Sequence, residues 1–405
     1  MEKTGPDGAA VQSVRYVSWG GLHGYPTAAV GYLGAMMAAG VEVGWDLVVP
    51  DGRGGWCLAR SRRRARRVAC LDAIEGIDRA ALHRAIGRSV AADLEILHVV
   101  PELWPKLRAG AGPVVGNTVW ETDRLPRHWP RLLNATDGVI VPSVFNRDVF
   151  RDCGVTVPLS VVPHIAAPAP SSAGSREAVA FRRRHRIAEG HRIVYMIEAW
   201  TARKAPWRAI RAFVRAFDGD DGVTMVVKGP VKAQSSAVDH RSTGVAAQIE
   251  AIRSTVRSPP PVVLVTGDVT DREIQILHGI GDCYLSMSHG EGWGLSVFEA
   301  AASGNPVVTT GWGGTLEYLG ERYPLLVDFD LVNVVDVVGA SSFSPDQRWA
   351  SADIDHAGDL LRRVIEDPGA AAGECVSATG DLRGRFSQEA VTPALLSALD
   401  VVARR

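Results

Sequence analysis

Several features that would narrow the function are missing from this sequence. It has no apolar run of the ~18 residues that a membrane-spanning helix needs, and Met1–Ala10 lacks the apolar core of a signal peptide. Its formal net charge is -1, whereas nucleic-acid-binding domains are strongly basic. We therefore expect a cytoplasmic protein with no transmembrane segment and no nucleic-acid partner. A peripheral membrane contact stays open, and the sequence does not indicate an oligomeric state.

Cysteine is also scarce, and its spacing excludes a common class of metal site. The 5 cysteines are far apart, and no two form a C-x-x-C pair, so we expect no zinc site and no other metal. Their scatter suits reduced thiols in a cytoplasm. Short repeats and long low-complexity tracts are absent as well, so the chain is expected to fold into ordinary globular domains.

The length and the pattern of the chain indicate two domains. At 405 residues the sequence is too long for one ordinary domain. Apolar strands alternate with helices throughout, which predicts parallel sheets covered on both faces. We expect an α/β protein with two Rossmann-like, doubly wound domains and a cleft between them. The expected divisions are an N-terminal domain at 1–165, a linker of Ala, Pro, Ser and Gly at 166–175, a C-terminal domain at 176–385 and a final helical segment at 386–405.

The strongest motif is a glycine-rich loop between a strand and a helix. The loop, Gly290-Glu291-Gly292-Trp293-Gly294, follows an apolar strand at Cys283–Met287 and opens a helix expected at Ser296–Ser303. Backbone N–H groups of such a loop can approach a polyanion, and the following helix directs its positive end toward it. The pattern therefore predicts a site for a nucleotide diphosphate with a further group attached.

Two glutamates in this segment each have two interpretations. Glu299 can accept both vicinal hydroxyls of a ribose, but Ser296-x-x-Glu299 also fits a capping box, in which Glu299 would only cap its own helix. Glu291 can face sugar hydroxyls or a cation. The alternative is that Glu291 is a solvated acidic residue of the loop with no role in binding. The surrounding strand, glycines and helix favour the functional interpretation of this pair.

A basic pair precedes another expected helix, at Pro206–Phe217. Arg203 and Lys204 follow the buried strand at Ile193–Ile197, so their side chains can reach the mouth of the cleft. A guanidinium fork and a mobile ammonium together suit a diphosphate. A solvated basic pair is the alternative, but cations at a helix N-terminus oppose its macrodipole. Lys228, at the end of a further strand, is a third candidate phosphate contact.

The first half contributes weaker candidates. His23 lies in the glycine turn after the first strand, where it could act as a base or sugar contact, or be incidental. Glu121 and Asp123 follow another strand and could hold acceptor hydroxyls; otherwise they belong to a capped loop. The basic run at Arg60–Arg67 is interpreted as a solvated loop, and no role is assigned to it.

These residues resemble the donor site of retaining glycosyltransferases of family 4. The resemblance rests on the glycine loop through Glu299, on Gly304-x-Pro306-Val307-Val308 and Gly313-Gly314-x-x-Glu317, and on Arg203-Lys204. In the first half it rests on the segment Trp120–Pro126 and on Ser143-x-Phe145-Asn146.

The resemblance implies a GT-B fold and transfer of a sugar from a nucleotide diphosphate to an acceptor hydroxyl by front-face attack. It implies that Glu299 binds the ribose, that Glu291 meets the sugar, and that Arg203 and Lys204 neutralise the leaving diphosphate. The final helix would cross back onto the first domain.

The predicted site has three groups of residues, and no cofactor beyond the donor substrate is expected; the nucleotide is expected to be UDP or GDP. The catalytic candidates are Glu291, Arg203 and Lys204. The donor-binding candidates are Glu299, Gly290, Gly292, Gly294, Leu295, Gly21, Lys228 and Val269. The acceptor-side candidates are His23, Glu121 and Asp123.

Other functions stay open at this point. An inverting transferase on the same fold would use His23 as base, and the anomeric configuration of the product separates it from a retaining enzyme. A GT-B epimerase and a bilobed sugar-binding protein without catalysis are further alternatives. A dinucleotide dehydrogenase is disfavoured, because Trp19 stands where G-x-G-x-x-G needs glycine.

Overall fold

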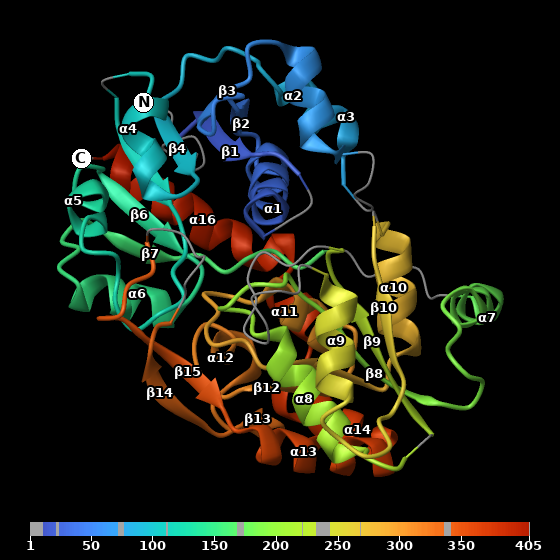
Figure 1. Ribbon diagram of the computed structural model, residues 1–405. Helices are drawn as coiled ribbons and strands as arrows, with labels where there is room; N and C mark the ends of the chain where they lie inside the picture. Colours follow the sequence, from blue (N-terminus) through green and yellow to red (C-terminus); the bar gives the residue numbers. More distant parts are fainter. Residues whose placement is uncertain are drawn as a thin grey trace. The chain divides into compact units, whose positions relative to one another are not determined.

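A computed structural model describes residues 11–21, 24–71, 77–110, 112–167, 174–220, 222–231, 244–267, 269–335 and 342–404. Contacts between residues divide the chain into two compact units (Figure 1). The first unit combines Met1–Trp120, Leu125–Pro168 and Arg383–Arg405, and the second combines Glu121–Arg124 with Ala169–Leu382. A four-residue segment from the first half of the sequence therefore groups with the second unit.

The first unit is built on a seven-stranded sheet in the order β3-β2-β1-β4-β5-β6-β7. β3 pairs antiparallel with β2, and the other neighbouring strands are parallel. Its inner strands are buried on both faces, which explains their continuous runs of apolar residues. The strands are β1 (Ser13–Trp19), β2 (Glu42–Pro50), β3 (Trp56–Leu58), β4 (Leu94–His98), β5 (Val114–Asn117), β6 (Gly138–Val141) and β7 (Leu159–Val161).

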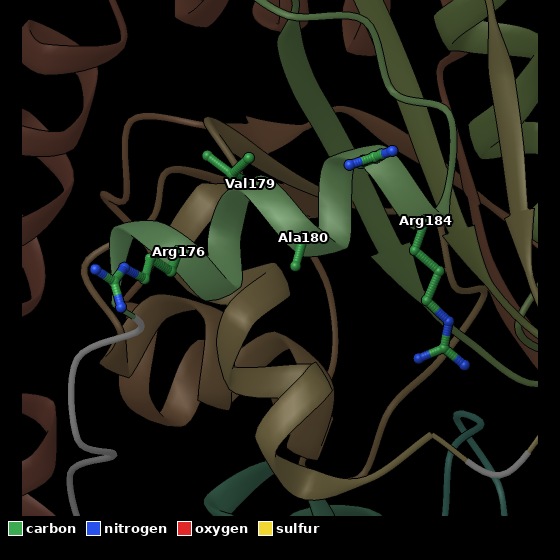
Figure 2. A pocket seen from close by; sticks show the side chains of 5 residues that line it. Arg176, Val179, Ala180 and Arg184 are labelled. Atoms are coloured by element: carbon green, nitrogen blue, oxygen red, sulfur yellow. The ribbon is translucent and has the colours of Figure 1, made fainter.

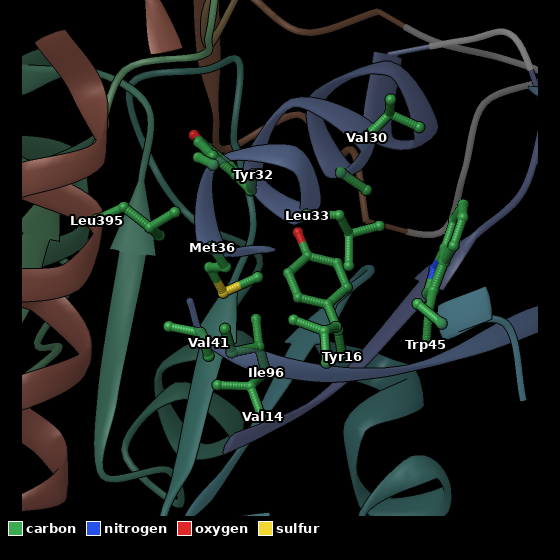
Figure 3. Packing of buried hydrophobic residues seen from close by; sticks show 14 of the residues in the cluster. Val14, Tyr16, Val30, Tyr32, Leu33, Met36, Val41, Trp45, Ile96 and Leu395 are labelled. Carbon is green, nitrogen blue, oxygen red and sulfur yellow. The ribbon is translucent and has the colours of Figure 1, made fainter. Parts of the chain in front are cut away.

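Helices from both ends of the sequence cover this sheet. Helices α1 and α16 contact each other, and α16 also contacts β5 and β6. Figure 3 shows Leu395 of α16 in the same core as Tyr32 and Met36 of α1 and Val14 of β1. The helices are α1 (Gly24–Ala38), α2 (Arg62–Ala69), α3 (Arg79–Ala85), the short 3-10 helix η2 (Pro101–Leu103), α4 (Trp104–Leu107), α5 (Trp129–Leu133), α6 (Val144–Asp152) and α16 (Gln388–Ala403).

The second unit is built on a six-stranded, wholly parallel sheet in the order β10-β9-β8-β11-β12-β13. The second unit also contains a separate two-stranded antiparallel sheet, β14-β15. The strands are β8 (Arg192–Ile197), β9 (Val223–Lys228), β10 (Val262–Val265), β11 (Cys283–Ser286), β12 (Val307–Thr310), β13 (Leu326–Val327), β14 (Phe329–Asn333) and β15 (Arg348–Ala352).

Helix α8 turns an apolar face toward this sheet and contacts β11. Its residues Trp207, Ile210, Phe213 and Val214 are buried, at the spacing of one helical face. The helices are α7 (Ser175–Arg184), α8 (Pro206–Ala216), α9 (Val245–Arg253), α10 (Asp271–Ile280), α11 (Leu295–Ala302), α12 (Leu316–Leu319), α13 (Ile354–Glu366) and α14 (Pro368–Thr379). Helix α15 (Leu382–Arg385) begins at the last residue of this unit and continues into the first.

The α/β class with two Rossmann-like parallel sheets is confirmed. The interpretation of Arg60–Arg67 as a loop is wrong, because Arg62–Ala69 forms helix α2. The Ser61 side chain caps that helix, and Ala65 and Ala69 are its buried residues, so a helix forms without a wide apolar stripe. Over the described ranges, no helix has the length and apolar character needed to cross a membrane.

Candidate functional site

A tight loop after β8 presents the basic pair. The N–H of Lys204 donates to Thr201 Oγ1 (3.3 Å), and the N–H of Ala205 donates to the Thr201 carbonyl (3.0 Å). Ala205 is the N-cap of α8 and has φ 42°, a left-handed conformation that costs a non-glycine residue about 1 kcal/mol or more. The loop is therefore closed and strained just where Arg203 and Lys204 leave the backbone.

The glycine loop after β11 is attached to the same backbone. The N–H of His289 donates to the carbonyl of Arg203 (2.7 Å), and Arg203 Nη1 donates to the carbonyl of Gly290 (2.7 Å). The carbonyl of Glu291 accepts from the N–H of Gly314 (2.7 Å), in the second glycine turn. Three loops that follow strands of one parallel sheet are thus joined by main-chain contacts.

A network of buried charges fills this position. Lys204 Nζ lies 2.6 Å from Glu291 Oε1 and 2.9 Å from Glu198 Oε2. Arg203 approaches Glu291 Oε2 at 3.2 Å and Glu121 Oε1 at 3.6 Å. The five side chains are at most 20% exposed. Three carboxylates therefore surround two cations in a site that is largely closed to water.

Burial and charge pairing compete in setting the protonation of this network. Burial raises the pKa of Glu291, but Lys204 and Arg203 outweigh it and lower the pKa to about 2. Burial lowers the pKa of Lys204, but Glu198 and Glu291 outweigh it, so the net shift is upward. Burial raises the pKa of both Glu198 and Glu121, with Lys204 and Arg203 respectively opposing the rise. Both cations therefore stay charged over the physiological pH range.

Close packing explains two glycines of this site, Gly290 beside Glu291 and Gly314 in the second glycine turn. A Cβ atom at Gly290 would lie 1.9 Å from the carbonyl oxygen of Glu121, and one at Gly314 would lie 2.0 Å from that of Gly292. Real Cβ atoms do not approach backbone this closely. The glycine loop is therefore held between the Glu121 segment and the second glycine turn, and its glycines permit that contact.

The structure shows that Ser296 and Glu299 do not form a capping box. Helix α11 begins at Leu295 with Gly294 as N-cap, and no side chain caps it. Ser296 consequently lies inside the helix, and Glu299 is one turn further along, half-buried. The capping box required Ser296 at the N-cap, so that interpretation is wrong, and a role for Glu299 toward a ligand stays a prediction.

The remaining predicted donor-side residues lie at loops and strand ends. Lys228 is the last residue of β9, half-buried, and its carbonyl accepts the N–H of Glu198 (3.2 Å). Val269, half-buried, precedes Thr270, the N-cap of α10. Gly21, in the first unit, has φ 122°, which requires glycine. Lys228 therefore meets the main chain of Glu198, and a role for any of the three residues toward a donor stays a prediction.

The acceptor-side candidates have unequal outcomes. Glu121 contacts Arg203, as described above. Asp123 is bound to β15: its Oδ1 accepts from the N–H of Arg348 (2.6 Å), and its Oδ2 accepts from Arg348 Nε (2.8 Å). His23 lies outside the described residues. Contact of any of the three with an acceptor stays a prediction.

Sequence reasoning missed two parts of the site. The first is Glu198, which directly follows β8, together with Ser286 of β11, whose Oγ donates to Glu198 Oε1 (3.0 Å). The second is strand β15, where the Trp349 ring stacks on His289 at 4.7 Å and the N–H of Ala350 donates to the His289 carbonyl (2.8 Å). The position after a buried strand would have pointed to Glu198, as it did to Arg203.

A hollow elsewhere on the second unit has a different character. It is an open depression of about 680 Å³, and the described residues that line it belong to α7. Figure 2 shows Val179 and Ala180 between Arg176 and Arg184 on this one helix. The four labelled residues are exposed, and no buried polar group lines the hollow, so it lacks the converging groups of a ligand site.

Comparison with known proteins identifies the class of the second unit. Residues 179–329 match the family model described as glycosyl transferases group 1, which covers well under half of the chain. The segment that matches this family includes Arg203, Lys204, Glu291 and Glu299. A comparison with curated protein sequences gave no match.

Solved structures with a similar fold are GT-B glycosyltransferases, and the GT-B fold of this chain is thereby established. Anabaena Alr3699/HepE, in complex with UDP and glucose, is 14% identical over 96% of this chain and 99% of its own, with a TM-score of 0.60. The E. coli trehalose-6-phosphate enzyme bound with UDP-2-fluoro glucose is 14% identical over 96% and 99%, with a TM-score of 0.58. S. aureus TarM, in complex with fondaparinux, alpha-GlcNAc-glycerol and UDP, is 16% identical over 75% of this chain, with a TM-score of 0.52, and the match spans only 55% of the TarM chain.

Proposed function

We propose that the protein is a retaining glycosyltransferase of the family 4 type, which transfers a sugar from a nucleotide diphosphate sugar to an acceptor hydroxyl. The observation that carries this proposal is the buried contact of Arg203 and Lys204 with Glu291, inside the segment that matches the glycosyltransferase family. UDP is the expected nucleotide, since the HepE and E. coli structures contain UDP or a UDP sugar.

The geometry supports an exchange of partners when the donor binds. The oxygens Glu198 Oε2 and Glu291 Oε1 contact Lys204 as ions, but neither has a hydrogen bond of normal geometry. A diphosphate would offer the cations several better-placed oxygens, with about 1.5–3 kcal/mol for each charge-assisted hydrogen bond. Glu291 would then turn to the hydroxyls of the sugar, which satisfy its buried carboxylate. Glu299 would bind the ribose.

The proposed reaction occurs on one face of the sugar. The acceptor oxygen forms a bond with C1 as the bond from C1 to the phosphate oxygen breaks. The bonding pair leaves with the diphosphate, and the departing phosphate oxygen takes the proton of the acceptor hydroxyl. Arg203 and Lys204 stabilise the charge that develops on the leaving group, so we propose that no metal ion is required. We further propose that the reaction takes place in the cytoplasm, where the 5 scattered thiols would be reduced.

The test begins with a panel of nucleotide sugars in a thermal-shift assay, because a ligand that binds the folded state raises the melting temperature. A UDP sugar should stabilise the protein, and Arg203→Ala and Glu299→Ala should each weaken its binding about tenfold or more. Unchanged affinity in both variants would remove the donor-site assignment.

Product analysis then separates the enzymatic alternatives. With an accepted donor and acceptor, an α-linked donor should give an α-linked product and release the nucleotide diphosphate only when acceptor is present. A β-linked product would indicate an inverting enzyme. Diphosphate release without acceptor would favour an epimerase, and failure to turn over any nucleotide sugar would favour a binding protein.

A further inference from the structure

Glu198 occupies the rigid side of the charge network. It directly follows β8, and its N–H donates to the carbonyl of Lys228 on the neighbouring strand β9 (3.2 Å). Its side chain is only 3% exposed, and its Oε1 accepts from Ser286 Oγ on β11 (3.0 Å). Main chain and side chain are thus both fixed to neighbouring strands, and the remaining oxygen, Oε2, meets Lys204 Nζ at 2.9 Å.

The second carboxylate on Lys204 is held differently. Glu291 lies in the glycine loop, not at a strand end, and it shares its charge between Lys204 and Arg203. If a diphosphate takes those two cations, Glu291 is the partner that can leave, since a sugar hydroxyl can replace them. Glu198 is too deeply buried for that exchange. A lysine side chain loses up to about 2 kcal/mol of conformational entropy when it is fixed, so a permanent partner lowers that cost at the moment of binding.

We propose that Glu198 is a positioning residue that holds the Lys204 ammonium between the ends of β8 and β11, in place for the diphosphate of the donor. This inference rests on the proposed function and adds to it a residue that touches neither the substrate nor the reacting atoms. Glu198 acts through Lys204 alone, because its two oxygens are taken by Lys204 and Ser286.

The pH dependence of diphosphate binding distinguishes positioning from a merely structural role. Four charged groups interact with Lys204: Glu198, Glu291, Arg203 and Glu121. In the wild type, Glu198 and Glu291 raise the pKa of Lys204. Deprotonation of Lys204 should therefore change the affinity for UDP little between pH 7.5 and 9.5. In Glu198→Gln, burial and Arg203 oppose a smaller carboxylate charge, so the pKa of Lys204 should fall and the affinity for UDP should decrease as the pH rises through this range.

The experiment is calorimetric titration with UDP, and with inorganic pyrophosphate as a probe that lacks the base. Glu198→Gln should bind UDP weakly at pH 7.5, and its affinity relative to the wild type should fall at least about tenfold by pH 9.5, since one pKa unit corresponds to a factor of ten. Lys204→Met should bind weakly with no such fall. Glu250→Gln, the same substitution on the exposed face of α9, should match the wild type.

Two less disruptive variants, Ser286→Ala and Glu198→Asp, test the inference if Glu198→Gln does not fold. Ser286→Ala removes one hydrogen bond and leaves the charge, so affinity should drop about two- to threefold with a wild-type pH profile. Glu198→Asp keeps the charge one methylene further from Lys204 and should show the same pattern with a larger drop. A wild-type profile and affinity in every Glu198 and Ser286 variant would overturn the inference alone. A wild type that binds neither UDP nor pyrophosphate would overturn the proposed function and this inference with it.

Discussion

The two parallel sheets end in polar clusters of opposite character. In the first unit, Tyr16 Oη lies 2.6 Å from His98 Nδ1, and Trp45 Nε1 donates to Ser18 Oγ (2.9 Å). Burial, and next to it the nearby His164, lowers the pKa of His98 well below its ordinary value, so this cluster is neutral. In the second unit the corresponding strand ends carry Glu198, Lys204 and their charged neighbours.

The difference in charge between the two clusters supports the proposed donor site in the second unit. Neutral hydroxyls and imidazoles can satisfy one another in a core at little net cost. Buried ions cannot, because desolvation of each costs several kcal/mol and pairing repays it only with good geometry. The second cluster has one carboxylate more than it has cations, with two oxygens outside hydrogen-bond geometry. Such an arrangement is poor as a stabilising core and suits a site that receives a charged ligand.

The largest expected effect separates the two clusters by stability. Lys204→Met should lower the free energy of unfolding by about 3–5 kcal/mol, because it leaves two buried carboxylates without their shared cation. His98→Leu in the first unit should cost only about 1–3 kcal/mol, since it leaves one neutral Tyr16 hydroxyl unpaired. Urea unfolding of both variants measures the difference. Equal losses of unfolding free energy in Lys204→Met and His98→Leu would contradict the contrast between the charged and the neutral cluster.

A second prediction concerns the packing that holds the charged loop. Gly314→Ala should lower stability by about 3 kcal/mol, because its Cβ would meet the backbone of Gly292 and neither chain can yield. Gly304→Ala is the matched control: its φ is 83°, but nothing lies within 4 Å of the added atom, so about 1 kcal/mol is expected. Thermal unfolding of the pair tests this. Similar losses would mean that the close contact at Gly314 costs no more than the left-handed backbone at Gly304.

The third prediction sharpens the comparison through pH. The pKa of Glu291 falls from 4.5 to about 2 on folding, so its ionised form contributes stability that is fully present above pH 4.5 and is lost as pH falls toward 2. Between pH 7 and pH 3, the stability difference between the wild type and Glu291→Gln should shrink by about 2 kcal/mol. Urea midpoints across this range measure it. A difference that stays constant would show that Glu291 is not paired as described.

The sequence predicted the elements that carry strong local signals. The strands expected at Ile193–Ile197 and Cys283–Met287 and the helix expected at Pro206–Phe217 follow from short-range rules, and the structure has them as β8, β11 and α8. The motif around Glu291 likewise pointed to Arg203 and Lys204, and the structure brings these three together. Their roles in binding and catalysis remain proposals.

The sequence did not predict the parts that depend on distant contacts. The β14-β15 sheet joins Asp123 and His289 from widely separated segments, and no local pattern announces such pairings. The capping box at Ser296 was locally plausible, but the packing of Gly294 against Thr315 and Tyr318 fixes the start of α11 elsewhere. Tertiary contacts therefore decided both features.

The most direct test of the account is a crystal structure of the protein with a bound UDP sugar. We predict that the diphosphate lies within hydrogen-bond distance of Arg203 and Lys204, that Glu291 has turned toward the sugar hydroxyls, and that Glu198 still holds Lys204. A diphosphate bound elsewhere, with Glu291 still paired to both cations, would contradict the account.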